Sequence, residues 1–171
     1  MYIGSTNQDG LHHLVNEVLD NSIDEVLAGH ATDISFQYKK DGSIKIKDNG
    51  RGIPIDFHPK YKNKRALEVV LTTLHAGGKF NSNAYKTSGG LHGVGISVVN
   101  ALSSLLQVQV FKDGKVYRQD YSKGKVKTKI KIEKCSKKLK GTEISFVPDE
   151  SIFEETPVSY THLTLPTTLQ V

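Results

Sequence analysis

The sequence predicts an α+β protein in which helices pack on one face of a mostly antiparallel sheet. Segments with helical apolar spacing come mainly before position 104, and short alternating segments separated by glycine turns follow. Elements segregated in this way bury their apolar faces against each other as a two-layer α/β sandwich. The stretch KVKTKIKI, at 125–132, alternates Lys with mostly apolar residues, which is typical of a sheet with one solvated face.

The first predicted helix covers 11–27, and Gly29 marks its end. Its apolar positions recur at helical spacing and are Leu11, Leu14, Val15, Val18, Leu19, Ile23, Val26 and Leu27. Two strands follow, DISFQY at 33–38 and SIKIKD at 43–48. The Lys-Asp-Gly turn between them predicts a hairpin.

The remaining elements are two helices and a β meander. The helices are expected over 66–75 and 96–104, with a glycine-rich segment at 76–95 between them. The expected strands are 105–111, 115–121, 126–134 and 142–148.

Composition bounds the class of protein. A chain of 171 residues with 37% hydrophobic and 24% charged residues fits one soluble globular domain. No apolar run reaches the roughly 20 residues of a membrane span, and no leader is visible, so no membrane partner is expected. The single cysteine, Cys135, excludes an internal disulfide and favours a cytoplasmic setting.

The formal net charge of +5 permits an anionic partner. Most of the excess lysine lies within 112–140. Contact of these strands with DNA is one interpretation, and a solvated sheet face is the one we favour, because charge runs usually have that role.

Residues 157–171 differ from the rest of the chain. The stretch PVSYTHLTLPTTLQV has no Asp, Glu, Lys or Arg, and it continues neither helix nor strand. It resembles translated adapter sequence on truncated reading frames. We therefore expect a domain at 1–156 and a non-native tail at 157–171.

Three polar residues share one stripe of the first helix: Glu17, Asn21 and Asp24. A carboxylate can orient and deprotonate water, and an amide oxygen one turn later can ligate Mg²⁺. Most such stripes are solvated faces, and the helix alone favours that interpretation.

The motif DNGRGIP follows the second strand. Asp48 ends the strand, and Gly50 and Gly52 flank Arg51. A tight turn is one explanation, because Asp and Gly are common in turns. The other is a carboxylate that accepts a ligand hydrogen bond, with glycines that let the ligand approach the backbone. Pro54 sets the direction of the exit.

The stretch KTSGGLHGVGISVVNAL, at 86–102, contains Gly89, Gly90, Gly93 and Gly95 before an apolar run. Its order, G-x-x-G-x-G, is neither the Rossmann fingerprint nor a P-loop. A glycine loop that enters a helix still offers free N–H groups to an anion, so phosphate binding is favoured over a linker. Upstream, HAGGKF contributes Lys79, and the polar segment 80–87 between the glycines suggests a lid or an ordinary surface loop.

These motifs together resemble one family. NEVLDNSIDEVLAGH, DNGRGIP, LHAGGKF and KTSGGLHGVGISVVNAL, in this order, resemble the ATPase domain of bacterial type II topoisomerase B subunits, which belong to the GHKL superfamily. The resemblance covers 1 to 156 and implies the Bergerat α/β sandwich. DNA gyrase B and topoisomerase IV B are equally compatible with it.

The resemblance implies ATP and Mg²⁺ as cofactors and a role for each matching residue. Glu17 would be the general base, Asn21 the magnesium ligand, and Asp48 the acceptor for the adenine amino group. Arg51 and Pro54 would line the adenine pocket, Thr142 would support it, and Arg118 would lie at its rim. The remaining ATP-binding positions implied are Asp24, Gly52, Lys79, Ser88, Gly89, Gly90, Leu91, His92, Gly93, Val94 and Gly95.

The family also implies partners. ATP binding would close a homodimeric gate of B subunits around a DNA segment, together with a topoisomerase A-type subunit. The family's N-terminal arm would precede MYIG, and its γ-phosphate lysine and glutamine would follow in a transducer domain. We therefore expect the 171-residue chain to bind ATP but to hydrolyse it poorly. Robust turnover that Glu17→Ala abolishes would contradict this.

Two other functions are compatible with the looser motifs. One is another GHKL ATPase, of the chaperone, mismatch-repair or sensor-kinase type, against which HAGGKF and YKTSGGLHGVG argue. The other is a module that binds nucleotide without turnover. His12, His13 and His75 form no metal-ligand motif, and none is assigned to them.

Overall fold

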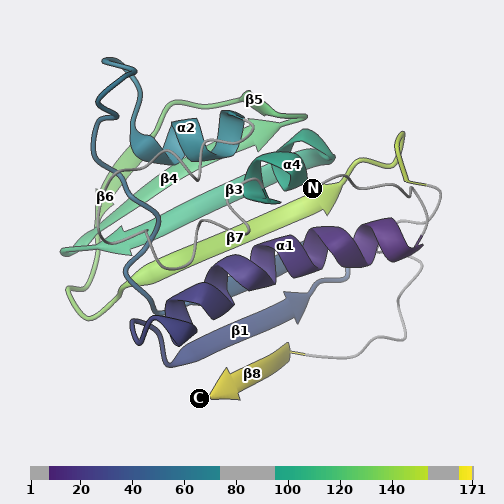
Figure 1. Cartoon of the computed structure of the whole chain (residues 1–171), viewed down its shortest axis with the longest axis horizontal. Coiled ribbons are helices and arrows are strands. Elements are labelled where there is room, and N and C mark those ends of the chain that lie inside the picture. Colours follow the sequence, from purple (N-terminus) through teal and green to yellow (C-terminus); the bar gives the residue numbers. More distant parts are fainter. Residues whose placement is uncertain (1–7, 74–94, 154–165, 171) are drawn as a thin grey trace.

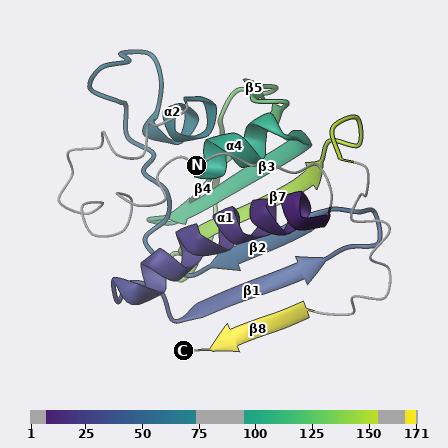
Figure 2. The same ribbon diagram turned by 45° about the vertical axis from the view of Figure 1, so that its right-hand side comes forward.

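The computed structural model describes residues 8–73, 95–153 and 166–170. The helices are α1 (Gln8–Leu27), α2 (Ala66–Thr72) and α4 (Gly95–Ala101). The strands are β1 (Asp33–Tyr38), β2 (Ile44–Asp48), β3 (Ser103–Lys112), β4 (Lys115–Ser122), β5 (Lys125–Val126), β6 (Lys131–Lys134), β7 (Gly141–Pro148) and β8 (Pro166–Gln170). The three helices within the described residues lie on the same face of one sheet, which confirms the predicted fold class (Figures 1 and 2).

The strands run in the order β5-β4-β3-β7-β2-β1-β8, and β6 also pairs with β4. Each pairing between the described strands is antiparallel. Because β7 lies between β2 and β3 and runs opposite to both, the last residues of β2 and β3 and the first of β7 meet at one edge. This edge brings DNGRGIP close to GTEISF, far apart in the sequence.

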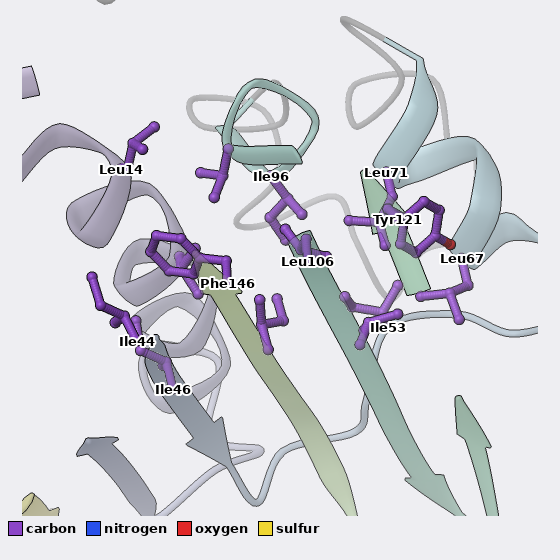
Figure 3. Close-up of a cluster of buried hydrophobic side chains, with 14 of the residues drawn as sticks. Leu14, Ile44, Ile46, Ile53, Leu67, Leu71, Ile96, Leu106, Tyr121 and Phe146 are labelled. Atoms are coloured by element: carbon purple, nitrogen blue, oxygen red, sulfur yellow. The ribbon is translucent and has the colours of Figure 1, made fainter. Parts of the chain in front are cut away.

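The core lies between the helices and the sheet (Figure 3). Alternate residues of the strands point into it, and helical residues meet them from the other side. Its most buried members include Leu14, Val18, Ile46, Leu67, Leu71, Val99, Leu106, Val108, Tyr121, Ile144 and Phe146.

The opposite face of the sheet is polar. Lys45 and Glu143 form an ion pair there at 2.9 Å, and Gln107 donates to Asp120 at 3.0 Å. The predicted alternation, with one apolar and one solvated face, is therefore confirmed for the central strands.

The apolar face of α1 is shorter than predicted. Leu11, Leu14 and Val18 are buried, but Ile23 is exposed and Leu27 is 79% exposed. Both share the helical spacing of the apolar positions but lie outside the buried face, because the second half of α1 turns the polar side chains of Ser22 and Glu25 towards the sheet edge.

Two predicted boundaries are also wrong. The third helix ends at Ala101 rather than 104, because Ser103 already begins β3 and donates its hydroxyl hydrogen to Val99 O at 2.6 Å. The predicted strand 126–134 is split into β5 and β6. Between them, the N–H groups of Lys127 and Thr128 both donate to the carbonyl oxygen of Asp120, so the chain bulges away from β4.

The tail contains one strand. Residues 166–170 form β8, paired antiparallel with β1. The expectation that 157–171 forms neither helix nor strand is therefore wrong for these residues, and the non-native origin of the tail stays a prediction.

Candidate functional site

Asp48 is the most enclosed polar residue at this sheet edge, with 2% of its surface exposed. Its Oδ2 accepts a hydrogen bond from Ser22 Oγ at 2.8 Å. Its Oδ1 accepts one from Gly50 N at 2.9 Å and a longer one from Thr142 N at 3.4 Å. Burial raises the pKa of Asp48 above its ordinary value, and Glu25 adds to this, while the three hydrogen bonds act in the opposite direction.

Gly141 lets β7 begin directly against Asp48. Its φ is +110°, and a Cβ at this position would overlap with the backbone oxygen of Asp48. The next residue, Thr142, accepts a hydrogen bond from Ile53 N through its hydroxyl at 3.0 Å. Thr142 therefore joins β7 to both halves of the DNGRGIP segment.

Arg51 is held by Glu25 on α1. Its Nη2 lies 2.7 Å from Glu25 Oε1, and its backbone N and Nε donate to Oε2 at 2.9 and 3.2 Å. Burial raises the pKa of Glu25, but the hydrogen bonds and charge of Arg51 outweigh burial, and the pKa falls below its ordinary value. Gly50 leaves room for this contact, because a Cβ there would lie 2.7 Å from Glu25 Oε2.

Glu17 lies at the other end of the site. It is 7% exposed, and a Cβ on Gly95, the first residue of α4, would overlap with its carboxylate. The solvated-face interpretation is therefore wrong for Glu17, whereas Asn21 and Asp24 are half-buried. Since α1 rises 1.5 Å per residue, Glu17 and Glu25 are about 12 Å apart along its axis.

A cavity of about 650 Å³ opens beside Gly50 and Arg51. Its other lining residues come from the α1–β1 connection, the end of β3 and the loop before β7: His30, Phe111, Lys112, Asp113, Lys137, Leu139 and Lys140. Its lining carries more cationic than anionic side chains. Asp48 is not among the lining residues, although Gly50, whose N–H donates to Asp48 Oδ1, is.

The structure brings one group of the described candidates together at the end of β2. Asp48, Arg51 and Thr142 are joined by the contacts above. Gly52 has φ +84°, and a Cβ there would lie 2.8 Å from Val110 Cγ1, so Gly52 packs closely on β3. Pro54 follows on the same segment and is half-buried.

Arg118 is not part of this group. It is exposed on β4 and paired in register with Gln109, on the sheet face away from the helices. Asp48 lies on the helix face, so the rim role of Arg118 stays a prediction. The other candidates lie outside the described residues: Lys79, Ser88, Gly89, Gly90, Leu91, His92, Gly93 and Val94.

Sequence reasoning missed Ser22, Glu25 and Lys112. A signal existed for the first two, because both continue the stripe of Leu14 and Val18 at helical spacing and are polar residues at positions where core residues are expected. Lys112 lies in a lysine-rich stretch, where nothing in the sequence distinguishes it from its neighbours. It lines the cavity only because the end of β3 lies beside the 137–140 loop.

The fold, the buried carboxylate of Asp48 at the end of β2 and the buried carboxylate of Glu17 on α1 define an ATPase domain of the GHKL type. The chain belongs to the family described as "Histidine kinase-, DNA gyrase B-, and HSP90-like ATPase", whose model matches residues 6–152. No helix in the described ranges is long and apolar enough to cross a membrane.

Within that family, the chain is similar to B subunits of type II topoisomerases. It is 60% identical over 153 residues to the B subunit of DNA topoisomerase 4 from Rickettsia bellii. That match covers 90% of this chain and 23% of that protein. It is 57% identical over 156 residues to the B subunit of DNA gyrase from Thermotoga maritima. That match covers 91% of this chain and 24% of that protein. The chain thus spans about a quarter of the length of these relatives.

A solved structure has the same fold. The 43K ATPase domain of Thermus thermophilus gyrase B, in complex with an aminocoumarin, superposes with a TM-score of 0.76 and 44% identity. The match covers 90% of this chain and 37% of that one.

Proposed function

We propose that this chain is the ATP-binding and ATP-hydrolysing domain of a type II DNA topoisomerase B subunit. The observation that carries the proposal is the buried carboxylate of Asp48 at the end of β2, which Ser22, Gly50 and Thr142 orient by hydrogen bonds. A buried carboxylate costs free energy unless it is hydrogen-bonded, and an open acceptor on it favours a ligand N–H group.

Asp48 would bind the adenine amino group. Gly52 and Ile53 come four and five positions later on the same segment, and neither has a polar side chain. The side chain of Arg51 is held by Glu25, and Thr142 joins Ile53 to β7. The sheet edge therefore suits a flat base that offers an N–H donor.

Glu17 would act at the phosphate end. It is enclosed between α1 and the start of α4, directly after the glycine-rich stretch, where a carboxylate can orient and deprotonate an attacking water. Asn21 and Asp24, on the same helix, offer the oxygen donors that a hard cation prefers, so this donor set fits Mg²⁺ with Asn21 as the ligand. When bound, Mg²⁺ supplies charge neutralisation for the phosphates. The triphosphate role of Lys79 and 88–94 rests on the sequence alone.

The relatives support a wider activity for the whole protein. Their names describe components of topoisomerase 4 and DNA gyrase, so we propose DNA, a topoisomerase A-type subunit and a second copy of the B subunit as partners of the whole protein, acting in the cytoplasm. Both kinds of relative match at nearly equal identity, so we propose the class and not one of the two enzymes.

Calorimetric titration with a non-hydrolysable ATP analogue and Mg²⁺ tests the proposal. We expect saturable binding by the chain and a loss of about tenfold or more for Asp48→Ala, because a hydrogen bond to a charged group contributes about 1.5–3 kcal/mol. Asp41→Ala is the matched control: its carboxylate also accepts bonds from a backbone N–H and a serine hydroxyl, but in the β1–β2 turn.

Two results would overturn the proposal. One is a folded chain, shown by circular dichroism, that binds no ATP analogue. The other is that the wild-type chain and the Asp48→Ala variant bind the ATP analogue with equal affinity.

A further inference from the structure

We propose that the cavity of about 650 Å³ beside Arg51 is a ligand site separate from the nucleotide site, and that it takes a small organic anion with an apolar part. Neither Asp48 nor Glu17 lines this cavity, so the inference goes beyond the proposed function. The volume lies within the range of roughly 300–1,000 Å³ that is usual for sites that bind small molecules.

The cavity lies where the α1–β1 connection, the β3–β4 turn and the loop before β7 meet. Figure 1 shows the end of α1, the β3–β4 turn and the start of β7 at the same end of the sheet. His30 comes from the first of these connections, Lys112 from the end of β3, and Lys140 from the last residue before β7. Residues far apart in the sequence therefore line one hollow.

Cationic side chains are in excess in the cavity. Lys112, Lys137 and Lys140 line it, and within the described residues none of them forms an ion pair. Arg51 is already paired with a carboxylate, and Asp113 is the only acidic residue in the described lining. Like charges gathered in a hollow focus a positive potential there, which attracts an anion.

Contacts between the β3–β4 turn and the loop before β7 hold the backbone that carries these lysines. The N–H of Cys135 donates to the carbonyl oxygen of Gly114 at 2.9 Å. Gly114 has φ +77°, and a Cβ there would lie 3.1 Å from Lys137 Cγ, so the turn packs closely on the stem of that lysine. The N–H of Leu139 donates to the carbonyl oxygen of Ser136 at 3.1 Å, which closes a turn in the loop. A framework held in this way lowers the cost of ordering on binding.

The lining also offers apolar surface to a ligand. Phe111 is half-buried, and Leu139 is a large apolar side chain that is 40% exposed. Contact with an apolar group of the ligand would remove this surface from water. An inorganic anion would satisfy only the lysines, whereas an aromatic phosphate or carboxylate satisfies both the lysines and the apolar side chains. This combination defines the class of ligand.

Titration of the whole chain with phenyl phosphate tests the inference. The nucleotide site is first filled with a non-hydrolysable ATP analogue and Mg²⁺, and NMR chemical shifts of the backbone amides in 111–114 and 137–140 are followed. We expect saturable shifts in both ranges. We also expect the affinity for phenyl phosphate to be about tenfold higher than that for inorganic phosphate or for phenol, because only phenyl phosphate has both the charge and the ring.

Variants separate the two parts of the site. Lys137→Gln with Lys140→Gln should lower the affinity for phenyl phosphate about tenfold, because two of the attracting charges are lost. Lys60→Gln with Lys62→Gln is the matched control, since it removes the same charge from exposed residues that do not line the cavity. Leu139→Gln should weaken binding of phenyl phosphate and leave that of inorganic phosphate unchanged.

Three results would overturn the inference: no saturable shift in the two ranges, an equal loss of affinity in both lysine pairs, or displacement of phenyl phosphate by the ATP analogue. The last result would place the probe in the nucleotide site. Absence of ATP-analogue binding by the wild-type chain would instead overturn the proposed function, and the shifts in 111–114 and 137–140 would still report on the cavity.

Discussion

Glu25 shows how a single buried carboxylate organises the DNGRGIP segment. Its two oxygens receive the side chain and the backbone N–H of Arg51, so it fixes both the conformation of the segment and the direction of the guanidinium. The side chains are mostly shielded from solvent, and the pair is therefore screened less than an exposed one.

The stability of this pair should depend on pH. Because the folded pKa of Glu25 is lowered, its contribution is present above the ordinary value of 4.5 and is lost as the pH falls through the folded pKa. We expect Glu25→Gln to lower the free energy of unfolding by about 1.5–3 kcal/mol at pH 7 and by much less below that window.

Urea unfolding of both proteins from pH 7 to pH 3 measures this difference. A destabilisation of the same size across the whole range would show that packing, and not the charge of Glu25, is responsible.

At the scale of elements, the start of β7 is the most constrained point. β7 pairs with both β2 and β3, so its first residue must approach the end of β2 closely, and Gly141 has the positive φ that this approach requires. The position of Asp48 thus depends on the residue with which a neighbouring strand begins.

Gly141→Ala should therefore be much more damaging than Gly29→Ala. Both glycines have positive φ, which costs alanine about 1–2 kcal/mol, but nothing lies within 4 Å of a Cβ at Gly29. At Gly141 the added methyl group overlaps with backbone, and we expect about 3 kcal/mol or more in total.

Thermal and denaturant unfolding of the two variants measures the contrast. Equal destabilisation would mean that β2 and β7 can move apart at no cost, contrary to the close approach seen here.

At the scale of the whole molecule, the lysine-rich segment lies along the sheet edge formed by β5 and β6. All four residues of β6 are exposed, and β6 pairs with β4 on one side. An edge strand can pair with another chain, and lysines on it prevent such pairing. This supports the solvated interpretation of the segment over contact with DNA.

Replacing Lys131 and Lys134 by threonine should raise self-association while leaving DNA affinity unchanged, because the edge loses its repulsive charges. Lys60→Thr with Lys62→Thr removes the same charge from an exposed loop and serves as the control. Sedimentation velocity and a salt series of DNA binding measure both effects. A clear fall in DNA affinity for the β6 variant alone would favour direct contact with DNA instead.

The sequence by itself determined the fold class, the order of the main elements and the identity of Glu17, Asn21, Asp48, Arg51 and Thr142 as candidates. The fold class and element order follow from periodicity and turn residues, which act within a few neighbouring positions. Glu17, Asn21, Asp48 and Arg51 were candidates from their local motifs, whereas Thr142 was implied only by the family resemblance. The sequence could not place Ser22, Glu25 or Lys112, whose roles depend on partners 26 or more positions away or on a meeting of loops.

Tertiary structure decided which polar residues of α1 are buried and what they hold. The packing of α1 on β2 turns its second half towards Asp48 and Arg51, so Ile23 and Leu27 are exposed while Ser22 and Glu25 are enclosed. Helical periodicity describes one helix face but contains no information about whether a core or a site covers it. That is settled by strand order, which brings the ends of β2, β3 and β7 to the same edge.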